Sequence, residues 1–135
     1  KAAKDADARL VVLTGDTHTA WANELHDAGG QRRGVEFGCT SVTSAGAGDS
    51  MPFEELNWLM PEANDEVLYY NAFSKGFTIL TLAADRVEAE FIRVSTIKSQ
   101  TYFASTDARF VARESEIGGI SGLRRIMSGQ DVTGG

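Results

Sequence analysis

Residues 9–14 form a short, continuous apolar run with the sequence Arg-Leu-Val-Val-Leu-Thr, and Gly15 ends it. A run of this length that stops at a turn residue is typical of a strand buried on both faces. Residues 1–8 are rich in alanine, lysine and aspartate, which suits the end of a preceding helix. Because a helix followed by a buried strand is the pattern of an α/β layer, this segment predicts the α/β class.

The segments after this strand predict a β-hairpin. Residues 20–26 alternate loosely between apolar and polar side chains, and residues 34–40 are rich in β-branched and aromatic types. Gly29 and Gly30, which lie between them, supply the permissive backbone of a turn. We therefore expect the two segments to pair as antiparallel strands.

A helix and three strands are expected farther along the chain. Residues 51–61 place apolar side chains at helical spacing, with Pro52 suited to the first turn and Pro61 to the exit, which predicts a helix. Strand candidates joined by short turns then follow, and we expect them to form an antiparallel meander with one solvent-facing side. They cover residues 67–73, 76–83 and 86–95.

The C-terminal third carries weaker patterns. Residues 101–103 are compatible with an extension of a strand, and residues 107–116 are compatible with a helix. Beyond Gly118 the sequence is rich in glycine and has no clear period. We therefore expect residues 118–135 to form a poorly packed tail.

The acidic balance of the chain bears on its partners. The 19 acidic and 13 basic residues give a formal net charge of -6, so nucleic-acid binding is not expected. An anionic substrate would need a local positive centre, such as a metal ion or a helix N-terminus. The apolar runs fall far short of the roughly 20 residues that cross a bilayer, so no membrane span is expected. Because Cys39 is the single cysteine, an internal disulfide is excluded.

Asp16 and His18 follow the first predicted strand at its C-terminal end, where α/β sheets build ligand sites. In an extended segment, positions i and i+2 project to the same side, so we expect both side chains to address one metal ion or one substrate. A carboxylate suits Ca²⁺, Mg²⁺, Mn²⁺ or Fe³⁺, and a neutral imidazole suits zinc, iron or manganese. Alternatively, His18 hydrogen-bonds phosphoryl oxygens or protonates a leaving group.

A purely structural interpretation of this loop is also open. Asp16 or Thr17 can act as the N-cap of a helix, with His18 pointing to solvent. The chain would then be a non-catalytic α/β binding or interaction module that uses an exposed sheet face or edge. The small-residue segment 44–49 is likewise either a loop that closes over the site or a simple connection.

Three sequence blocks in the same order are similar to one family of enzymes. Residues 15–21 read Gly-Asp-Thr-His-Thr-Ala-Trp, and residues 34–44 contain Glu-Phe followed after three residues by Ser-Val-Thr-Ser. Residues 68–77 contain Tyr-Tyr-Asn and Lys-Gly-Phe, and residues 87–91 read Val-Glu-Ala-Glu-Phe. Over about residues 10–102 the chain therefore resembles the PhoD-type alkaline phosphatases, which are relatives of the calcineurin-like metallophosphoesterases.

The resemblance implies a fold of the α/β class. The chain would be a β-sandwich-like fragment of a metallophosphoesterase domain, with a mixed sheet, an antiparallel C-terminal meander and few helices. Residues 1–117 would be the C-terminal portion of that domain. The family's other metal ligands lie N-terminal to the motif that contains Asp16, so the chain alone is expected to be incomplete and inactive. An Asn-Pro-His element of the family is replaced here by Asn64-Asp65-Glu66.

The implied activity is metal-dependent hydrolysis of phosphate monoesters or diesters by an activated water or hydroxide. The resemblance implies Asp16 as a metal ligand, and His18 as a metal ligand or as a catalytic acid that contacts the phosphate. Divalent or trivalent metal ions are expected, with Ca²⁺ and Fe³⁺ as the suggested combination. The resemblance also implies a periplasmic or secreted location, a phosphate ester as substrate, and the N-terminal part of the catalytic domain as a partner.

Overall fold

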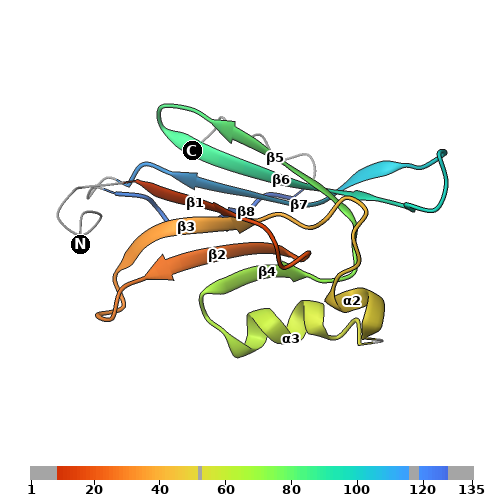
Figure 1. The fold of residues 1–135 in the computed structure, drawn as a ribbon. Helices are drawn as coiled ribbons and strands as arrows, with labels where there is room; N and C mark the ends of the chain where they lie inside the picture. Colours follow the sequence, from red (N-terminus) through yellow and green to blue (C-terminus); the bar gives the residue numbers. More distant parts are fainter. Residues whose placement is uncertain (1–8, 52, 116–118, 128–135) are drawn as a thin grey trace.

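The computed structural model describes residues 9–51, 53–115 and 119–127. Within these residues, two four-stranded sheets lie face to face and short helices lie beside the first sheet (Figure 1). The helix end expected in residues 1–8 lies outside the described residues. The arrangement confirms the expected sandwich, with one mixed sheet, one antiparallel sheet and few helices.

The first sheet is mixed. Its strands are β1 (Leu10–Thr14), β2 (Ala20–His26), β3 (Arg32–Gly38) and β4 (Val67–Asn71), in the spatial order β1-β3-β2-β4. β1 and β3 run parallel, and β2 is antiparallel to both β3 and β4, which confirms the predicted hairpin. β1 lies at the edge of the sheet, and Leu13 is 62% exposed. The prediction that this strand is buried on both faces is therefore wrong for the described residues.

The second sheet is an antiparallel meander. Its strands are β5 (Gly76–Leu82), β6 (Arg86–Val94), β7 (Ala104–Arg113) and β8 (Arg124–Arg125), in that spatial order. The strand expected to begin the meander is instead β4, which pairs with β2 in the first sheet. Residues 72–75 therefore cross from one sheet to the other, although their short length is typical of a hairpin turn.

The helix expected over residues 107–116 is wrong, because most of these residues belong to β7. Ala108, Phe110 and Ala112 are buried and occupy every second position, which places them on one face of a strand. β6 pairs with β5 along one edge, and β7 pairs with its other edge. The backbone hydrogen bonds of β7 are therefore made to β6 within the sheet. Strand pairing and burial thus override the local pattern that suggested a helix.

Helices α2 (Ala47–Ser50) and α3 (Leu56–Ala63) lie between β3 and β4 in the chain, and α3 runs beside β4 (Figure 1). The helix expected over residues 51–61 is displaced, because α3 begins later and contains Pro61 in its interior. The Asn64 side-chain amide donates to the Met60 carbonyl at 2.9 Å, which pairs one of the carbonyls at the helix end. Pro52 lies outside the described residues.

Four aromatic rings form the centre of the core between the sheets. Phe37 and Tyr69 come from the first sheet, and Phe91 and Phe110 come from the second. Neighbouring rings in this group have centroids 4.9 to 6.4 Å apart, which is the range of favourable tilted contacts. Alanines such as Ala22 fill the narrower space around these rings.

Residues 119–127 are packed against the sandwich, in contrast to the poorly packed tail expected there. Leu123 and Ile126 are buried, and β8 pairs with β7. The Leu123 backbone N–H donates to the Glu24 side chain at 2.8 Å, which ties this segment to the first sheet. Long-range contacts of this kind leave no periodic pattern in the sequence. The remaining residues of the expected tail, 118 and 128–135, lie outside the described residues.

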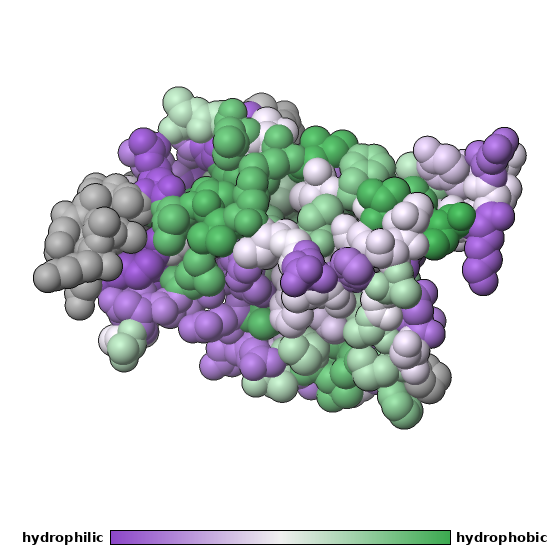
Figure 2. All heavy atoms as spheres, in the orientation of Figure 1, coloured by the Kyte–Doolittle hydropathy of each residue, from purple (hydrophilic) through white to green (hydrophobic). Residues whose placement is uncertain are grey.

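Apolar side chains also reach the surface. Figure 2 shows them gathered on the viewer's side of the molecule, over the region of β1 and β5 in Figure 1. On β5, Phe77, Ile79 and Leu82 are exposed, whereas β6 presents Glu88 and Glu90 between its buried residues. The solvent side expected of the meander is therefore polar on β6 but apolar on β5. Within the described residues, no helix is long and apolar enough to cross a membrane.

Candidate functional site

The loop that carries Asp16 and His18 connects β1 to β2 at the C-terminal end of β1. Because β1 and β3 are parallel, with Thr14 paired to Gly38, the loops that follow both strands leave the sheet at the same edge. The Cys39 backbone N–H donates to the Thr14 carbonyl at 2.9 Å and extends this contact into the loops. Such an edge is the usual place for a ligand site in a sheet with parallel strands.

The backbone of this loop turns sharply at the two candidate residues. The Thr17 backbone N–H donates to the Gly15 carbonyl at 2.8 Å, which is the hydrogen bond of a γ-turn centred on Asp16. Asp16 has a φ of 69° and His18 a φ of 56°, and they are the only non-glycine residues with positive φ in the described parts of the chain. Such conformations cost about 1–3 kcal/mol each and cluster at active sites and ligand clamps.

This geometry corrects two expectations about the loop. The segment from Asp16 to His18 is not extended, so the alternation of a strand does not determine where its side chains project. The N-cap interpretation is also wrong, because the loop leads into β2 and not into a helix. The left-handed backbone explains both differences, since it belongs to neither a strand nor a helix N-terminus.

The imidazole of His18 is held by the loop that follows β3. Its Nδ1 lies 2.5 Å from the carbonyl oxygen of Ala45. A carbonyl oxygen can only accept a hydrogen bond, so Nδ1 carries the proton, and in the neutral ring Nε2 presents its lone pair. The hydroxyl of Thr40 lies 3.1 Å from the carbonyl oxygen of His18 and 2.9 Å from that of Ser74, and its single hydrogen is shared between these two acceptors.

Asp16 is exposed and makes no side-chain hydrogen bond or ion pair with the described residues. A carboxylate without a protein partner and an imidazole with one open nitrogen are both donors that divalent or ferric ions accept. Within the described residues, no group of three or more histidine, cysteine, aspartate or glutamate side chains could hold a metal ion. Asp16 and His18 each offer one ligand atom of a suitable type, and two such atoms fall short of the three that a metal site of this kind requires.

The small-residue segment 44–49 packs against the candidate site. Gly46 lies so close to the loop of His18 that an added Cβ would stand 2.9 Å from the His18 carbonyl oxygen. Asp49 anchors the segment, because its Oδ2 accepts hydrogen bonds from the Gly46 N–H at 2.6 Å and from the Lys75 Nζ at 2.7 Å. The hydrogen bond from Lys75, followed by that from Gly46, lowers the pKa of Asp49 below its ordinary value.

A second group of side chains stabilises the loop that carries Asp16 and His18. The Trp21 indole N–H donates to the Thr19 hydroxyl at 2.5 Å, and that oxygen lies 2.9 Å from the hydroxyl oxygen of Thr17. Trp21 also packs against Tyr70 of β4 in a tilted arrangement, with ring centroids 4.4 Å apart. This tryptophan therefore packs on the sheet and holds the loop. Ala45 and Asp49 belong to the segment 44–49 that the sequence analysis noted, whereas it did not single out Thr40 as a supporting residue.

Known proteins share both the sequence and the fold of this chain. The PhoD-like phosphatase family model matches residues 1–91, which is more than half of the chain. Alkaline phosphatase D of Bacillus subtilis (strain 168) is 28% identical over 123 residues, which cover 88% of this chain and 20% of that protein. A solved structure of PhoD superposes with a TM-score of 0.72 at 26% identity and covers 98% of this chain and 25% of that one.

The chain thus spans about a fifth of the length of the curated relative and a quarter of the solved structure. The sequence and fold comparisons both identify PhoD, and they agree with the resemblance drawn from the loop of Asp16 and from the two later blocks. The chain belongs to the PhoD-like phosphatase family.

Proposed function

We propose that this chain supplies Asp16 and His18 to the metal centre of a PhoD-like phosphatase that hydrolyses phosphate monoesters or diesters. The left-handed backbone of both residues carries the proposal, because a conformation of this cost is kept where it positions side chains for a task. It lies at the edge where the parallel strands β1 and β3 end. When bound, the metal ions would polarise the phosphoryl group and activate a water molecule for attack.

Within this centre, the chain's own residues would bind the metal ions and orient the phosphoryl group. Asp16 offers an exposed carboxylate, a hard oxygen donor suited to Ca²⁺ and Fe³⁺. His18 offers Nε2, because Ala45 holds the proton on Nδ1, and metal-binding histidines commonly donate their other N–H to a carbonyl in this way. The same Nε2 could contact a phosphoryl oxygen and act as the catalytic acid once protonated. The remaining ligands would come from the N-terminal part of the domain.

The boundaries and the location of the protein are part of the same proposal. We assign residues 1–117 to the C-terminal portion of the catalytic domain, with the packed residues 119–127 completing its second sheet. By resemblance to the alkaline phosphatases of this family, we place the protein in the periplasm or outside the cell.

A titration of the ¹⁵N-labelled 135-residue chain with Mn²⁺ tests the ligand roles without any activity. Paramagnetic broadening should centre on residues 15–19, and Asp16→Asn or His18→Ala should each weaken it strongly. Asp65→Asn and His26→Ala are matched controls, because both residues lie outside the loop and should leave the broadening unchanged. Equal broadening in wild type, Asp16→Asn and His18→Ala would remove the site assignment and favour a non-catalytic binding module.

Hydrolysis of p-nitrophenyl phosphate and bis(p-nitrophenyl) phosphate tests the activity, in a PhoD-like domain that contains this chain together with the missing N-terminal part. We expect Asp16→Asn and His18→Ala each to lower kcat by about a hundredfold or more. The variants Asp65→Asn and His26→Ala should retain the wild-type rate. Full activity in both loop variants would contradict the proposal.

A further inference from the structure

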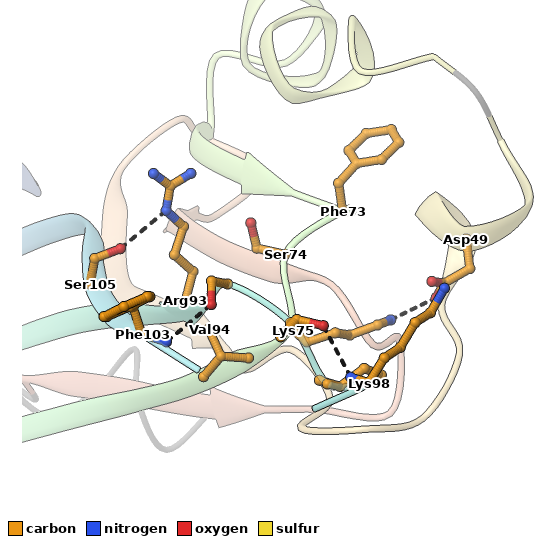
Figure 3. A pocket seen from close by; sticks show the side chains of 12 residues that line it. Asp49, Phe73, Ser74, Lys75, Arg93, Val94, Lys98, Phe103 and Ser105 are labelled. Carbon is orange, nitrogen blue, oxygen red and sulfur yellow. Dashed lines mark hydrogen bonds and ion pairs between the residues drawn. The ribbon is translucent and has the colours of Figure 1, made fainter. Parts of the chain in front are cut away.

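A second cavity lies apart from the loop of Asp16 and His18. Its volume is about 510 Å³, within the range of about 300–1,000 Å³ that is typical of small-molecule sites. It is formed by the crossing segment around Lys75, by the end of β6, and by the connection from β6 to β7 (Figure 3). Neither Asp16 nor His18 lines this cavity, which we call the Lys75 pocket.

The charged side chains of the Lys75 pocket are mainly cationic. Lys75, Arg93 and Lys98 line it together with one carboxylate, that of Asp49, although the whole chain has a net charge of -6. Figure 3 shows Lys75 and Lys98 extending toward Asp49, while the guanidinium of Arg93 lies on the other side of the pocket. Lys75 is only 8% exposed, so a cationic group is held in a mostly buried position here.

The carboxylates near the pocket do not fully neutralise these cations. Asp49 is shared, because it accepts a hydrogen bond from Lys75 at 2.7 Å and also lies in the field of Lys98. Arg93 has the carboxylate of Asp107 at 3.8 Å, which is long for an ion pair. The other oxygen of Asp107 is occupied, since it accepts hydrogen bonds from Tyr69 and Asn71.

The hydroxyl groups of the pocket are also available as donors. The oxygens of Ser95 and Thr96 accept the backbone N–H groups of residues 103 and 98, respectively. Likewise, Ser74 accepts from the Asn71 amide and Ser105 accepts from the Arg93 guanidinium. A hydroxyl that already accepts a hydrogen bond still has its own hydrogen to donate, and the described residues take none of these four. The pocket thus offers cations and O–H donors in excess over acceptors.

We propose that the Lys75 pocket binds the phosphate group of a small organic phosphate, without needing a metal ion. A phosphate carries only acceptor oxygens, and it matches the fork of an arginine, two ammonium groups and several hydroxyls. The pocket is larger than a single phosphate requires, and its apolar residues Phe73, Ile97 and Phe103 can cover the organic part of the ligand. The inference does not rest on the metal centre, because neither Asp16 nor His18 lines the pocket.

The test is an NMR titration of the ¹⁵N-labelled 135-residue chain with phenyl phosphate and with inorganic phosphate, both in EDTA. We expect saturable shifts at residues 74–75 and 93–98, with phenyl phosphate binding more tightly. The double variant Arg93→Ala/Lys98→Ala should raise the Kd by at least about tenfold, since it removes two charge-assisted hydrogen-bond donors. Both residues are exposed, so the variant should fold, and its amide spectrum away from the pocket checks this.

A matched control variant sharpens the test. Arg124→Ala/Arg125→Ala removes the same charge from exposed residues of β8 and should leave the Kd unchanged. Absence of saturable shifts, equal affinity in the Arg93/Lys98 double variant, or equally tight binding of benzoate would overturn the proposal. None of these outcomes affects the Mn²⁺ titration of Asp16 and His18, so the two proposals can fail separately.

Discussion

The His18 imidazole and the Ala45 carbonyl oxygen lie 2.5 Å apart although 27 residues separate them in the chain. This contact joins the loop after β1 to the loop after β3, two strands that are parallel neighbours in the sheet. It fixes the proton on Nδ1 and leaves Nε2 for a ligand. The orientation of the candidate site therefore depends on the position of the loop around Ala45.

Gly46→Ala should disturb this orientation. The new Cβ would stand 2.9 Å from the His18 carbonyl oxygen and 3.3 Å from the Lys75 Nζ, so the backbone of one loop must move. We expect a loss of about 1–3 kcal/mol in the free energy of unfolding, together with a ring ¹⁵N spectrum of His18 in which the Nδ1–H tautomer no longer dominates. Gly15→Ala is the matched control, because its Cβ meets nothing within 4 Å. An unchanged tautomer in Gly46→Ala would show that Ala45 does not hold the ring.

Asp16→Gly should relieve backbone strain. Glycine adopts a φ of 69° without steric cost, whereas aspartate does not. The control is Asp65→Gly, at an exposed residue that is not among those with positive φ, where glycine only adds flexibility to the unfolded chain. Urea denaturation should find Asp16→Gly more stable than Asp65→Gly by at least about 1 kcal/mol. Equal stabilities would mean that the γ-turn at Asp16 is not strained.

Tyr69→Phe should change how stability depends on pH. Burial, and then the hydrogen bond to Asp107, raise the pKa of Tyr69 well above its ordinary value of 10.0. The unfolded chain therefore loses this proton at a lower pH than the folded chain. Stability from this group is complete below pH 10.0 and falls as the pH rises beyond it, by up to about 1.4 kcal/mol per pH unit.

Urea denaturation on both sides of this pH measures the effect. The wild-type free energy of unfolding should fall more steeply above pH 10.0 than that of Tyr69→Phe. Below that pH the variant should be less stable by about 1–2 kcal/mol, because Asp107 loses one of its donors. Tyr70 remains in both proteins, and burial raises its pKa as well, so Tyr70→Phe is the matched comparison. Parallel curves for wild type and Tyr69→Phe would contradict the prediction.

Gly76→Ala should separate β5 from β6. A Cβ at this position would lie 1.8 Å from the Ile92 carbonyl oxygen, and that oxygen belongs to the backbone of the neighbouring strand. We expect a loss of at least about 2 kcal/mol in the free energy of unfolding, measured by urea denaturation. Gly15→Ala again serves as the control, since its surroundings are open. A loss below about 0.5 kcal/mol would show that the two strands can move apart without cost.

Local patterns predicted the elements whose partners are close in the sequence. The hairpin of β2 and β3 follows from two strand patterns on either side of Gly29 and Gly30. The pair of β5 and β6 follows in the same way from a short turn between alternating segments. In each case both strands and the turn that joins them lie within one short stretch of sequence. The local pattern is therefore sufficient to predict the strand pair.

Two strands differ from the prediction, β4 in its partner and β7 in its type. β4 was placed in the meander because residues 72–75 are as short as a hairpin turn, yet β4 pairs with β2. The pattern of residues 107–116 is compatible with a helix, yet most of these residues form β7, which contributes Phe110 to the aromatic core. Both assignments depend on which strand edge is free once the sheets have formed, and side-chain periodicity carries no information on that.

The sequence by itself determined the family and the two candidate residues, because a buried-type strand, a glycine and a fixed spacing of Asp16 and His18 are encoded in adjacent positions. Only the tertiary structure decided the left-handed turn, the tautomer of His18 and the cationic Lys75 pocket. Their contacts involve backbone carbonyls and segments far apart in the chain. A carbonyl group is present at every residue, so the residue type does not predict which carbonyl accepts the hydrogen bond of His18. That is decided only when the parallel strands bring the two loops together.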